Sequence, residues 1–306
     1  MKLGWKLLKF VPPGIDVFVK RHTSSDFRLW VREYFGGSAR SIPDRIVQVK
    51  DGRRIHIGPD YIYWPIYIGS EFEPEASSIV RRLLRPGDTV VDAGANYGWY
   101  STLSAQLVGD EGRVHAFEPV PLTYQRLVEH VDINGYRERV TTVQSALGVR
   151  DGTVRIHVFD NLSHSRSSLL PLDQNAFAAC DVPLTNLNAY LKNADVSRVD
   201  FLKCDVEGSE LSVFRGAGEY LGSVDAPIVM VELNHETSAA FDYTVDDLIN
   251  YLRDLGYNSF YAIEGTDRIV QLRENREIES HGLVLCGKND MISNRFNQSV
   301  PSRAAA

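Results

Sequence analysis

The sequence predicts an α/β fold in which a mostly parallel sheet is covered by helices on both faces. From residue 88 onward, short runs rich in β-branched and aliphatic residues alternate with helical segments, as in repeated βα units. Residues before 76 show a different pattern, with a hairpin signal and aromatic segments, which predicts an N-terminal helical and β-hairpin extension. Three predicted strands also end in a carboxylate, which indicates a ligand site at one edge of the sheet.

The predicted extension covers residues 1–75. The segment "RIVQVKDGRRIHIG" has alternating apolar residues on either side of Asp51-Gly52, a dipeptide that favours a tight hairpin turn. The next segment, "SEFEPEASSIVRRLL", places its apolar residues on one helical face before Pro86-Gly87 ends the helix. The extension is therefore expected to pack on the domain that follows it.

The first residues, "MKLGWKLLKFVPPG", combine three lysines with an apolar set of side chains. A basic amphipathic segment of this kind can lie on an anionic membrane surface. A short helix docked on the protein, or a frayed end, is the favoured interpretation, because about three helical turns is marginal for membrane anchoring. Both interpretations stay open at this point.

The main domain is predicted over residues 76–290, with residues 291–306 as a flexible tail. Its expected strands are "DTVVDAG", "GRVHAFEP", "RVTTVQSALG", "VDFLKCDVEG" and "PIVMVELN", followed by "NSFYAI" and "HGLVLCG". Its expected helices are "WYSTLSAQLVG", "PLTYQRLVEHVDING", "TNLNAYLKNA", "SELSVFRGAGEYL" and "TVDDLINYLRDLG", and "DGTVRIHVFD" is expected to form one arm of a hairpin. In such a sheet, ligands bind at the carboxyl ends of the strands, near the point where the strand order reverses.

Charge and cysteine content exclude several classes of function. The net charge of -7 and the pI of about 5.6 argue against a nucleic-acid partner. The three cysteines are widely spread, so they suggest neither a disulfide framework nor a zinc site. No run approaches the roughly 18 consecutive apolar residues of a membrane span. We expect a cytoplasmic protein with a small-molecule partner; its oligomeric state stays open.

Carboxylates end three of the predicted strands. Asp92 ends the first, Glu118 ends the second, and Asp205 with Glu207 ends the fourth. Each has an ordinary alternative, because an Asp before a turn can bond the turn's amides and a Glu before a proline can cap a helix. Strand ends from distant parts of the chain converge in this architecture, so we expect these side chains to surround one cleft.

The loop "DAGANYG" narrows the choice of ligand. It is not the G-x-G-x-x-G loop that places a pyrophosphate at a helix N-terminus, because Asp92 stands where that approach needs neutral backbone. Gly94 and Gly98 would let the backbone approach a ligand closely, and Glu118 can accept from both ribose hydroxyls. S-adenosylmethionine, which has a ribose, an ammonium group and a sulfonium group, suits these residues.

The series "VVDAGANYGWYS", "GRVHAFEPVPLTYQRL", "VQSALG", "VPLTNLNAYL" and "VDFLKCDVEGSELSVFRGA" resembles the FkbM family of S-adenosylmethionine-dependent methyltransferases, from about Phe72 to Ile263. The resemblance implies the class I methyltransferase (Rossmann-like) fold, which is a seven-stranded sheet with helices on both faces. The last strand of this sheet runs antiparallel, and "HGLVLCG" can supply it. It also implies roles for particular residues. These are a cofactor loop of Asp92, Gly94, Asn96, Tyr97 and Gly98, a ribose-binding Glu118, an adenine site at Gln144, Ser145 and Ala146, and a cofactor–acceptor boundary at Asp205 and Glu207.

An oxygen acceptor of high pKa needs a general base, and the candidates are Asp205, Glu207 and His235. Asp205 is also a candidate for binding the cofactor's ammonium group, which would leave the proton to one of the other two. His235 follows a predicted buried strand, where a histidine is often only solvated or part of a helix cap. No spacing of ligands demands a metal ion, so none is predicted.

The sequence therefore predicts an O-methyltransferase that acts on a hydroxyl of a sugar, glycan or natural product. The class of acceptor comes from the family resemblance and not from the residues themselves. The alternatives are a nucleotide-cofactor oxidoreductase, against which the missing G-x-G-x-x-G argues, and a non-catalytic cofactor-binding or scaffold protein.

Overall fold

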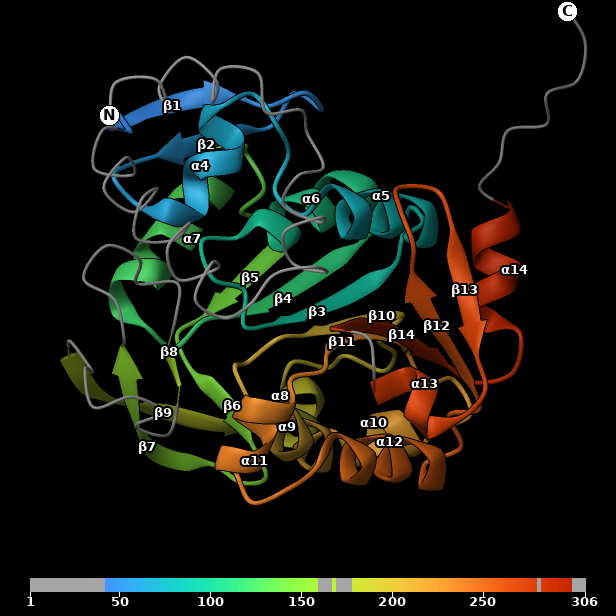
Figure 1. Cartoon of the computed structure of the whole chain (residues 1–306). Coiled ribbons are helices and arrows are strands. Elements are labelled where there is room, and N and C mark those ends of the chain that lie inside the picture. Colours follow the sequence, from blue (N-terminus) through green and yellow to red (C-terminus); the bar gives the residue numbers. More distant parts are fainter. Residues whose placement is uncertain (1–41, 159–166, 169–177, 280–281, 299–306) are drawn as a thin grey trace, which may run out of the picture.

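The computed structural model describes residues 42–158, 167–168, 178–279 and 282–298 (Figure 1). The amphipathic first segment of the chain lies outside these residues, so neither interpretation of it is tested. Within the described part of the chain, an eight-stranded sheet forms the centre of the molecule, and helices cover both of its faces. This is the α/β class that the alternating pattern predicts.

The strands of the central sheet lie in a defined order. From one edge to the other they are β13 (Ile269–Leu272), β12 (Ser259–Ile263), β14 (Leu283–Gly287), β11 (Ile228–Glu232), β10 (Phe201–Cys204), β3 (Thr89–Ala93), β4 (Arg113–Phe117) and β5 (Val140–Val143). The five strands from β11 to β5 are parallel, whereas β14 runs antiparallel to both β11 and β12. The expected antiparallel strand in "HGLVLCG" is thus confirmed.

The sheet has one strand more than the seven predicted. The additional strand is β13, which pairs antiparallel with β12 at the edge of the sheet. Its sequence, "IVQL", is short and only partly buried, because an edge strand has a neighbour on one side only. The sequence therefore shows no long apolar run that would have marked it.

Two hydrophobic cores lie on the two faces of the sheet, and successive residues of a strand enter different cores. In β3, for example, Val90 belongs to one core and Val91 to the other. The first core also contains residues of α5 (Pro74–Leu83), α6 (Trp99–Val108), α7 (Pro121–Ile133) and α14 (Met291–Gln298). The second contains residues of α8 (Leu187–Asn193), α9 (Glu210–Gly216), α10 (Gly218–Gly222), α12 (Val245–Asp254) and α13 (Asn275–Glu279).

The described part of the N-terminal extension contains the predicted hairpin. β1 (Arg45–Gln48) and β2 (Arg54–Ile57) pair antiparallel around the predicted turn. Ile55 and Ile57 of β2 are fully buried in the first core, beside α7. A 3₁₀ turn (Tyr61–Tyr63) and α4 (Trp64–Tyr67) then lead to α5, as Figure 1 shows.

A second sheet has the order β6 (Ala146–Gly148), β9 (Ala178–Asn186), β7 (Gly152–Val158) and β8 (Ser167–Ser168). The segment "RVTTVQSALG" was expected to form one strand of the central sheet. It instead breaks at Gln144 and Ser145, so that β5 ends the central sheet and β6 begins the second one. The expected hairpin arm, β7, pairs antiparallel with β9, which lies between β6 and β7.

The C-terminal segment differs from the expected flexible tail. Residues 291–298 form α14, which contacts α5 and β14. Ile292 and Phe296, four residues apart on one helical face, are buried, and Arg295 pairs with Asp88 and Asp200. The prediction of a flexible tail is therefore wrong for residues 291–298; residues 299–306 lie outside the described part.

Candidate active site

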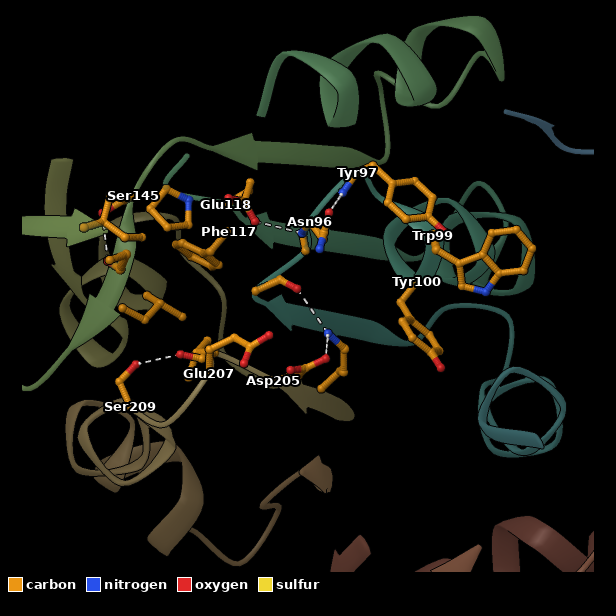
Figure 2. Close-up of a pocket in the computed structure, with 18 of the residues that line it drawn as sticks. Asn96, Tyr97, Trp99, Tyr100, Phe117, Glu118, Ser145, Asp205, Glu207 and Ser209 are labelled. Carbon is orange, nitrogen blue, oxygen red and sulfur yellow. Dashed lines mark hydrogen bonds and ion pairs between the residues drawn. The ribbon is translucent and has the colours of Figure 1, made fainter. Parts of the chain in front are cut away.

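A cleft with about 850 Å³ of space, which includes the open solvent at its mouth, lies at the carboxyl ends of β3, β4 and β10. β3 has β4 on one side and β10 on the other, so this is the point at which the strand order reverses. Residues that line the cleft are Ile62, Phe72, Gly94, Ala95, Asn96, Tyr97, Trp99, Tyr100, Phe117, Glu118, Pro119, Ser145, Ala146, Leu147, Ile156, Lys203, Asp205, Val206, Glu207 and Ser209 (Figure 2).

The loop between β3 and α6 requires glycine at Gly94. Its φ is +75°, and a Cβ atom there would lie 1.9 Å from the backbone carbonyl oxygen of Asp205. The glycine thus lets two loops of the cleft touch each other. Gly98 has a φ of +86° and packs in the same way against Leu127 of α7. The structure thus shows close approaches of both glycines to the protein's own chain, and their expected approach to a ligand stays a prediction.

Replacing Gly94 with alanine is expected to destabilise the fold by roughly 2–5 kcal/mol, because strain at positive φ is added to a clash with backbone. Gly135 provides a matched control, since its φ is +73° but a Cβ atom added there would have nothing within 4 Å. Gly135→Ala should cost only about 1–2 kcal/mol. Urea unfolding of both variants measures the difference, and equal losses would show that the contact with Asp205 is unimportant.

Glu118 connects the ends of β3 and β4. Its Oε2 accepts from the Asn96 backbone N–H, as Figure 2 shows, and its Oε1 accepts from that of Val120, both at 2.9 Å. The side chain is only 5% exposed, and burial raises the pKa of Glu118 to about 7. Each carboxylate oxygen has two lone pairs and uses one of them for these amides, so each can still accept one hydrogen bond from a ligand.

Lys203 is a buried cation on β10 that faces three oxygen atoms. Its Nζ lies 3.2 Å from Asp205 Oδ2 and 3.8 Å from Asp92 Oδ1, and it donates to the Gly94 carbonyl oxygen at 3.1 Å. Burial alone would lower the pKa of Lys203, but the carboxylates of Asp205 and Asp92 raise it overall. Lys203 therefore remains charged and ties the end of β10 to the end of β3.

Asp92 lies behind the wall of the cleft and is not among the residues that line it. It is 1% exposed, and its Oδ2 accepts from the Ser101 hydroxyl on α6 at 2.6 Å. Its Oδ1 has no hydrogen-bond partner among the described residues, and burial raises the pKa of Asp92 against the opposing effect of Lys203. The expectation that Asp92 forms a wall of the cleft is therefore corrected: Asp92 holds α6 and Lys203 in place from behind. Gly98 also lies outside the lining.

Three other residues expected at the cofactor, Tyr97, Ser145 and Ala146, also line the cleft, and the hydroxyl of Ser145 is bonded to other parts of the chain. The Ser145 hydroxyl contacts Thr185 Oγ1 at 2.7 Å and the Pro183 carbonyl oxygen at 2.9 Å. Ala146 follows it as the first residue of β6. The Tyr97 ring is 2% exposed and packs edge-on against Tyr63, so its contribution to the cleft is steric.

The loop after β10 carries the two acidic candidates for the general base. Asp205 and Glu207 both line the cleft, on the side opposite Glu118 in Figure 2. Glu207 has a left-handed backbone, with φ at +54°. The buried Glu210 organises this loop, because its Oε1 accepts from the backbone N–H groups of Val206 and Gly208, each at 3.1 Å. Glu210 thus has a structural role in "DVEGSE".

His235 is exposed at the first position of α11 (His235–Ala240) and does not line the cleft. The N-cap of this helix is Asn234, whose side chain accepts from the backbone N–H of Glu236. Of the three candidate bases, the structure thus brings Asp205 and Glu207 together in the cleft and leaves His235 at the surface.

The sequence analysis missed several residues around the cleft. Ile62 and Phe72 come from the N-terminal extension, and Ile156 comes from the second sheet. No local pattern marks them, because their position depends on how distant elements pack. Glu232, at the end of β11, was also missed, although the rule that selected the other strand-end carboxylates applies to it. It is hydrogen-bonded to the Asp205 side chain.

Two kinds of feature are absent from the described residues. Within residues 42–158, 167–168, 178–279 and 282–298, no group of three or more His, Cys, Asp or Glu side chains is arranged to hold a metal ion. None of the helices in that same part of the chain is long and apolar enough to cross a membrane.

The strand order and the cleft at its reversal point define a class I methyltransferase fold. A family model described as the methyltransferase FkbM domain matches residues 92–259, which is more than half of the chain. The chain belongs to the FkbM methyltransferase family, as the sequence motifs predict. Family membership also supports S-adenosylmethionine as the cofactor.

Two curated relatives are similar over this region. Methyltransferase sdnD of Sordaria araneosa is 30% identical over 158 residues, which cover 42% of this chain and 60% of the relative. The 31-O-demethyl-FK506 methyltransferase FkbM of Streptomyces tacrolimicus is 30% identical over 162 residues, which cover 44% of this chain and 60% of the relative. The chain thus spans less than two thirds of the length of either relative.

Among solved structures, the chain resembles Aeropyrum pernix fibrillarin in complex with S-adenosyl-L-methionine. The TM-score is 0.41 at 14% identity, with 79% of this chain and 95% of that chain covered. Similarity at this level says nothing about the acceptor.

Proposed function

We propose that this chain is an S-adenosylmethionine-dependent methyltransferase that methylates a hydroxyl oxygen of a sugar, glycan or natural product. The observation that carries the proposal is the cleft at the sheet's reversal point, where the buried Glu118 and the backbone of residues 94–97 face the carboxylates of Asp205 and Glu207. The Streptomyces relative is a 31-O-demethyl-FK506 methyltransferase by name, which supports an oxygen acceptor. The net charge of -7 supports a small acceptor over a nucleic acid.

The residues of the cleft fit this cofactor. The remaining lone pairs of Glu118 suit the two ribose hydroxyls, and the apolar side chains of Phe117, Leu147 and Ile156 suit a flat ring such as adenine. Asp205 provides a carboxylate for an ammonium group. S-adenosylmethionine, when bound, supplies an electrophilic methyl group on a sulfonium sulfur.

The chain itself contributes positioning and proton transfer. Alignment of an acceptor oxygen with the methyl donor is expected to provide much of the rate enhancement. Lys203 holds Asp205 at 3.2 Å, which fixes that carboxylate at the cofactor side. Glu207 lies further along the same loop, is half-buried and lines the cleft, so we propose it as the group that accepts the hydroxyl proton.

Glu207→Gln is expected to lower turnover by about 10²- to 10⁴-fold, the range for loss of general-base catalysis, while cofactor affinity stays within about twofold. The amide keeps the size of the side chain but cannot accept the proton. His235→Ala is the comparison variant and should retain full turnover, because His235 lies outside the cleft lining. Methyl transfer from labelled cofactor measures both; full activity of Glu207→Gln, or its loss in His235→Ala, would contradict this assignment of the base.

The acceptor class is tested by incubating the protein with methyl-labelled S-adenosylmethionine and a cell extract, and by identifying the labelled product. We expect a small molecule or glycan with a new methyl ether. Label confined to protein or RNA would contradict the proposed acceptor, while the methyltransferase activity itself would stand.

A further inference from the structure

Glu232 lies beside the active-site loop on the strand that neighbours β10. Cys204, the last residue of β10, pairs with Val231 of β11, so Asp205, just past the end of β10, lies beside Glu232, the last residue of β11. The two side chains are hydrogen-bonded to each other. On its other side, Glu232 pairs with Leu283 of β14, whose side chain is uncharged.

The surroundings of Glu232 are strongly acidic. Besides burial, the charges of Asp205, Glu207 and Glu210 all raise the pKa of Glu232. Lys203 is the cation that pairs with Asp205 at 3.2 Å. Two carboxylates can share a hydrogen bond only if one of them holds a proton. Burial, together with the charges of Asp205 and Glu207, raises the pKa of Glu232 well above its usual value, which favours Glu232 as the carboxyl group that holds this proton.

We propose that Glu232 is a positioning residue of the active site, which donates a shared proton to Asp205 and holds its carboxylate in place against Lys203. The trio of Glu232, Asp205 and Lys203 then has no net charge, and Asp205 is fixed from two directions at the cleft. This inference rests on the proposed function, because Asp205 is the carboxylate assigned to the cofactor.

A consequence of this arrangement is a defined dependence on pH. When Glu232 loses its proton at high pH, the hydrogen bond to Asp205 is replaced by repulsion between two carboxylates. Asp205 then loses its fixed position. Glutamine at this site would still donate from its amide group and would not titrate, so Glu232→Gln should preserve the geometry at any pH. Leucine has a similar size but no donor.

The shared proton is tested directly by ¹³C NMR of the side-chain carboxyl groups in glutamate-labelled protein. We expect one signal that is protonated at pH 7, titrates at higher pH and is absent from Glu232→Gln. Glu118, whose pKa is about 7, gives a second such signal, which Glu118→Gln identifies. If the Glu232 signal instead titrates near the ordinary glutamate value, the proposal is wrong.

The positioning role is tested by calorimetric titration with S-adenosylhomocysteine. As pH rises through the midpoint observed for Glu232, the affinity of the unaltered protein should fall at least fivefold more than that of Glu232→Gln, in which only the titration of Glu118 remains. Glu232→Leu should bind at least tenfold more weakly below that midpoint. A parallel fall in Glu232→Gln would overturn the proposal, as would unchanged affinity of Glu232→Leu. If the leucine variant does not fold, the comparison with the glutamine variant is sufficient to decide the test.

The failure of this proposal differs from the failure of the proposed function. If only Glu232 is misassigned, the unaltered protein binds the cofactor but the glutamine variant follows its pH dependence. If the chain does not use S-adenosylmethionine, the unaltered protein binds neither the cofactor nor S-adenosylhomocysteine at any pH, and the positioning role is overturned with it.

Discussion

Glu118→Ala is expected to weaken the binding of S-adenosylmethionine by about 1–3 kcal/mol, or roughly 5- to 150-fold in affinity. The substitution removes the proposed acceptor of the ribose hydroxyls. It also leaves the backbone N–H groups of Asn96 and Val120 without their partner, so the loop after β3 loses its connection to β4. Calorimetric titration measures the loss. Unchanged affinity would remove Glu118 from the cofactor site.

Glu118→Gln is the matched control for Glu118→Ala, because glutamine keeps the size of the side chain and one acceptor oxygen. Burial raises the pKa of Glu118 from 4.5 to about 7, so the folded state binds more protons than the unfolded state between these values. The stability that Glu118 contributes is therefore present at low pH and is lost as pH rises from about 5 to 7. The glutamine variant should lack this dependence of stability on pH. If unfolding of the variant and of the unaltered protein depends on pH in the same way, the raised pKa of Glu118 is contradicted.

Lys203→Met is expected to destabilise the fold by about 3–5 kcal/mol, which is the usual cost of removing one partner from a buried ion pair. Asp92 is 1% exposed and would retain no cation beside it. Its pKa, which burial already raises, would rise further, so the loss should be smaller at low pH and larger at high pH. Unfolding in urea at two pH values measures both effects.

The double substitution Asp92→Asn with Lys203→Met tests the cause of this loss. It removes the buried carboxylate together with its cation, and we expect it to recover most of the lost stability. If the double variant is as unstable as Lys203→Met alone, the cost arises from packing and not from an unpaired charge.

The sequence predicted the elements whose signals are local. The Asp51-Gly52 hairpin, the helix that ends before Pro86 and the strands of the central sheet are all present. The break at Ser145 was not predicted, because neither Gly nor Pro interrupts "VTTVQSAL", so the segment is interpreted as one strand. Which sheet each half joins depends on β9, which lies far along the chain. The helix of residues 291–298 is stabilised by contacts with α5 and β14, which no local pattern reveals.

The candidate site was predicted to the level of strand ends. Glu118, Asp205 and Glu207 meet in one cleft, as convergence of parallel strands requires. The error at Asp92 has a simple origin: side chains alternate along a strand, and Asp92 points to the α6 side, where it meets Ser101. Glu232 was within reach of the same reasoning, since it ends the strand "IVMVE" in the way that Asp92 ends β3.

Calorimetric titration of the unaltered protein with S-adenosylmethionine, S-adenosylhomocysteine and NADH tests the central claim most directly. A methyltransferase of the FkbM family with this cleft should bind both S-adenosyl compounds at a single site and should not bind NADH. Binding of NADH with no binding of either S-adenosyl compound would contradict the account and would favour an oxidoreductase.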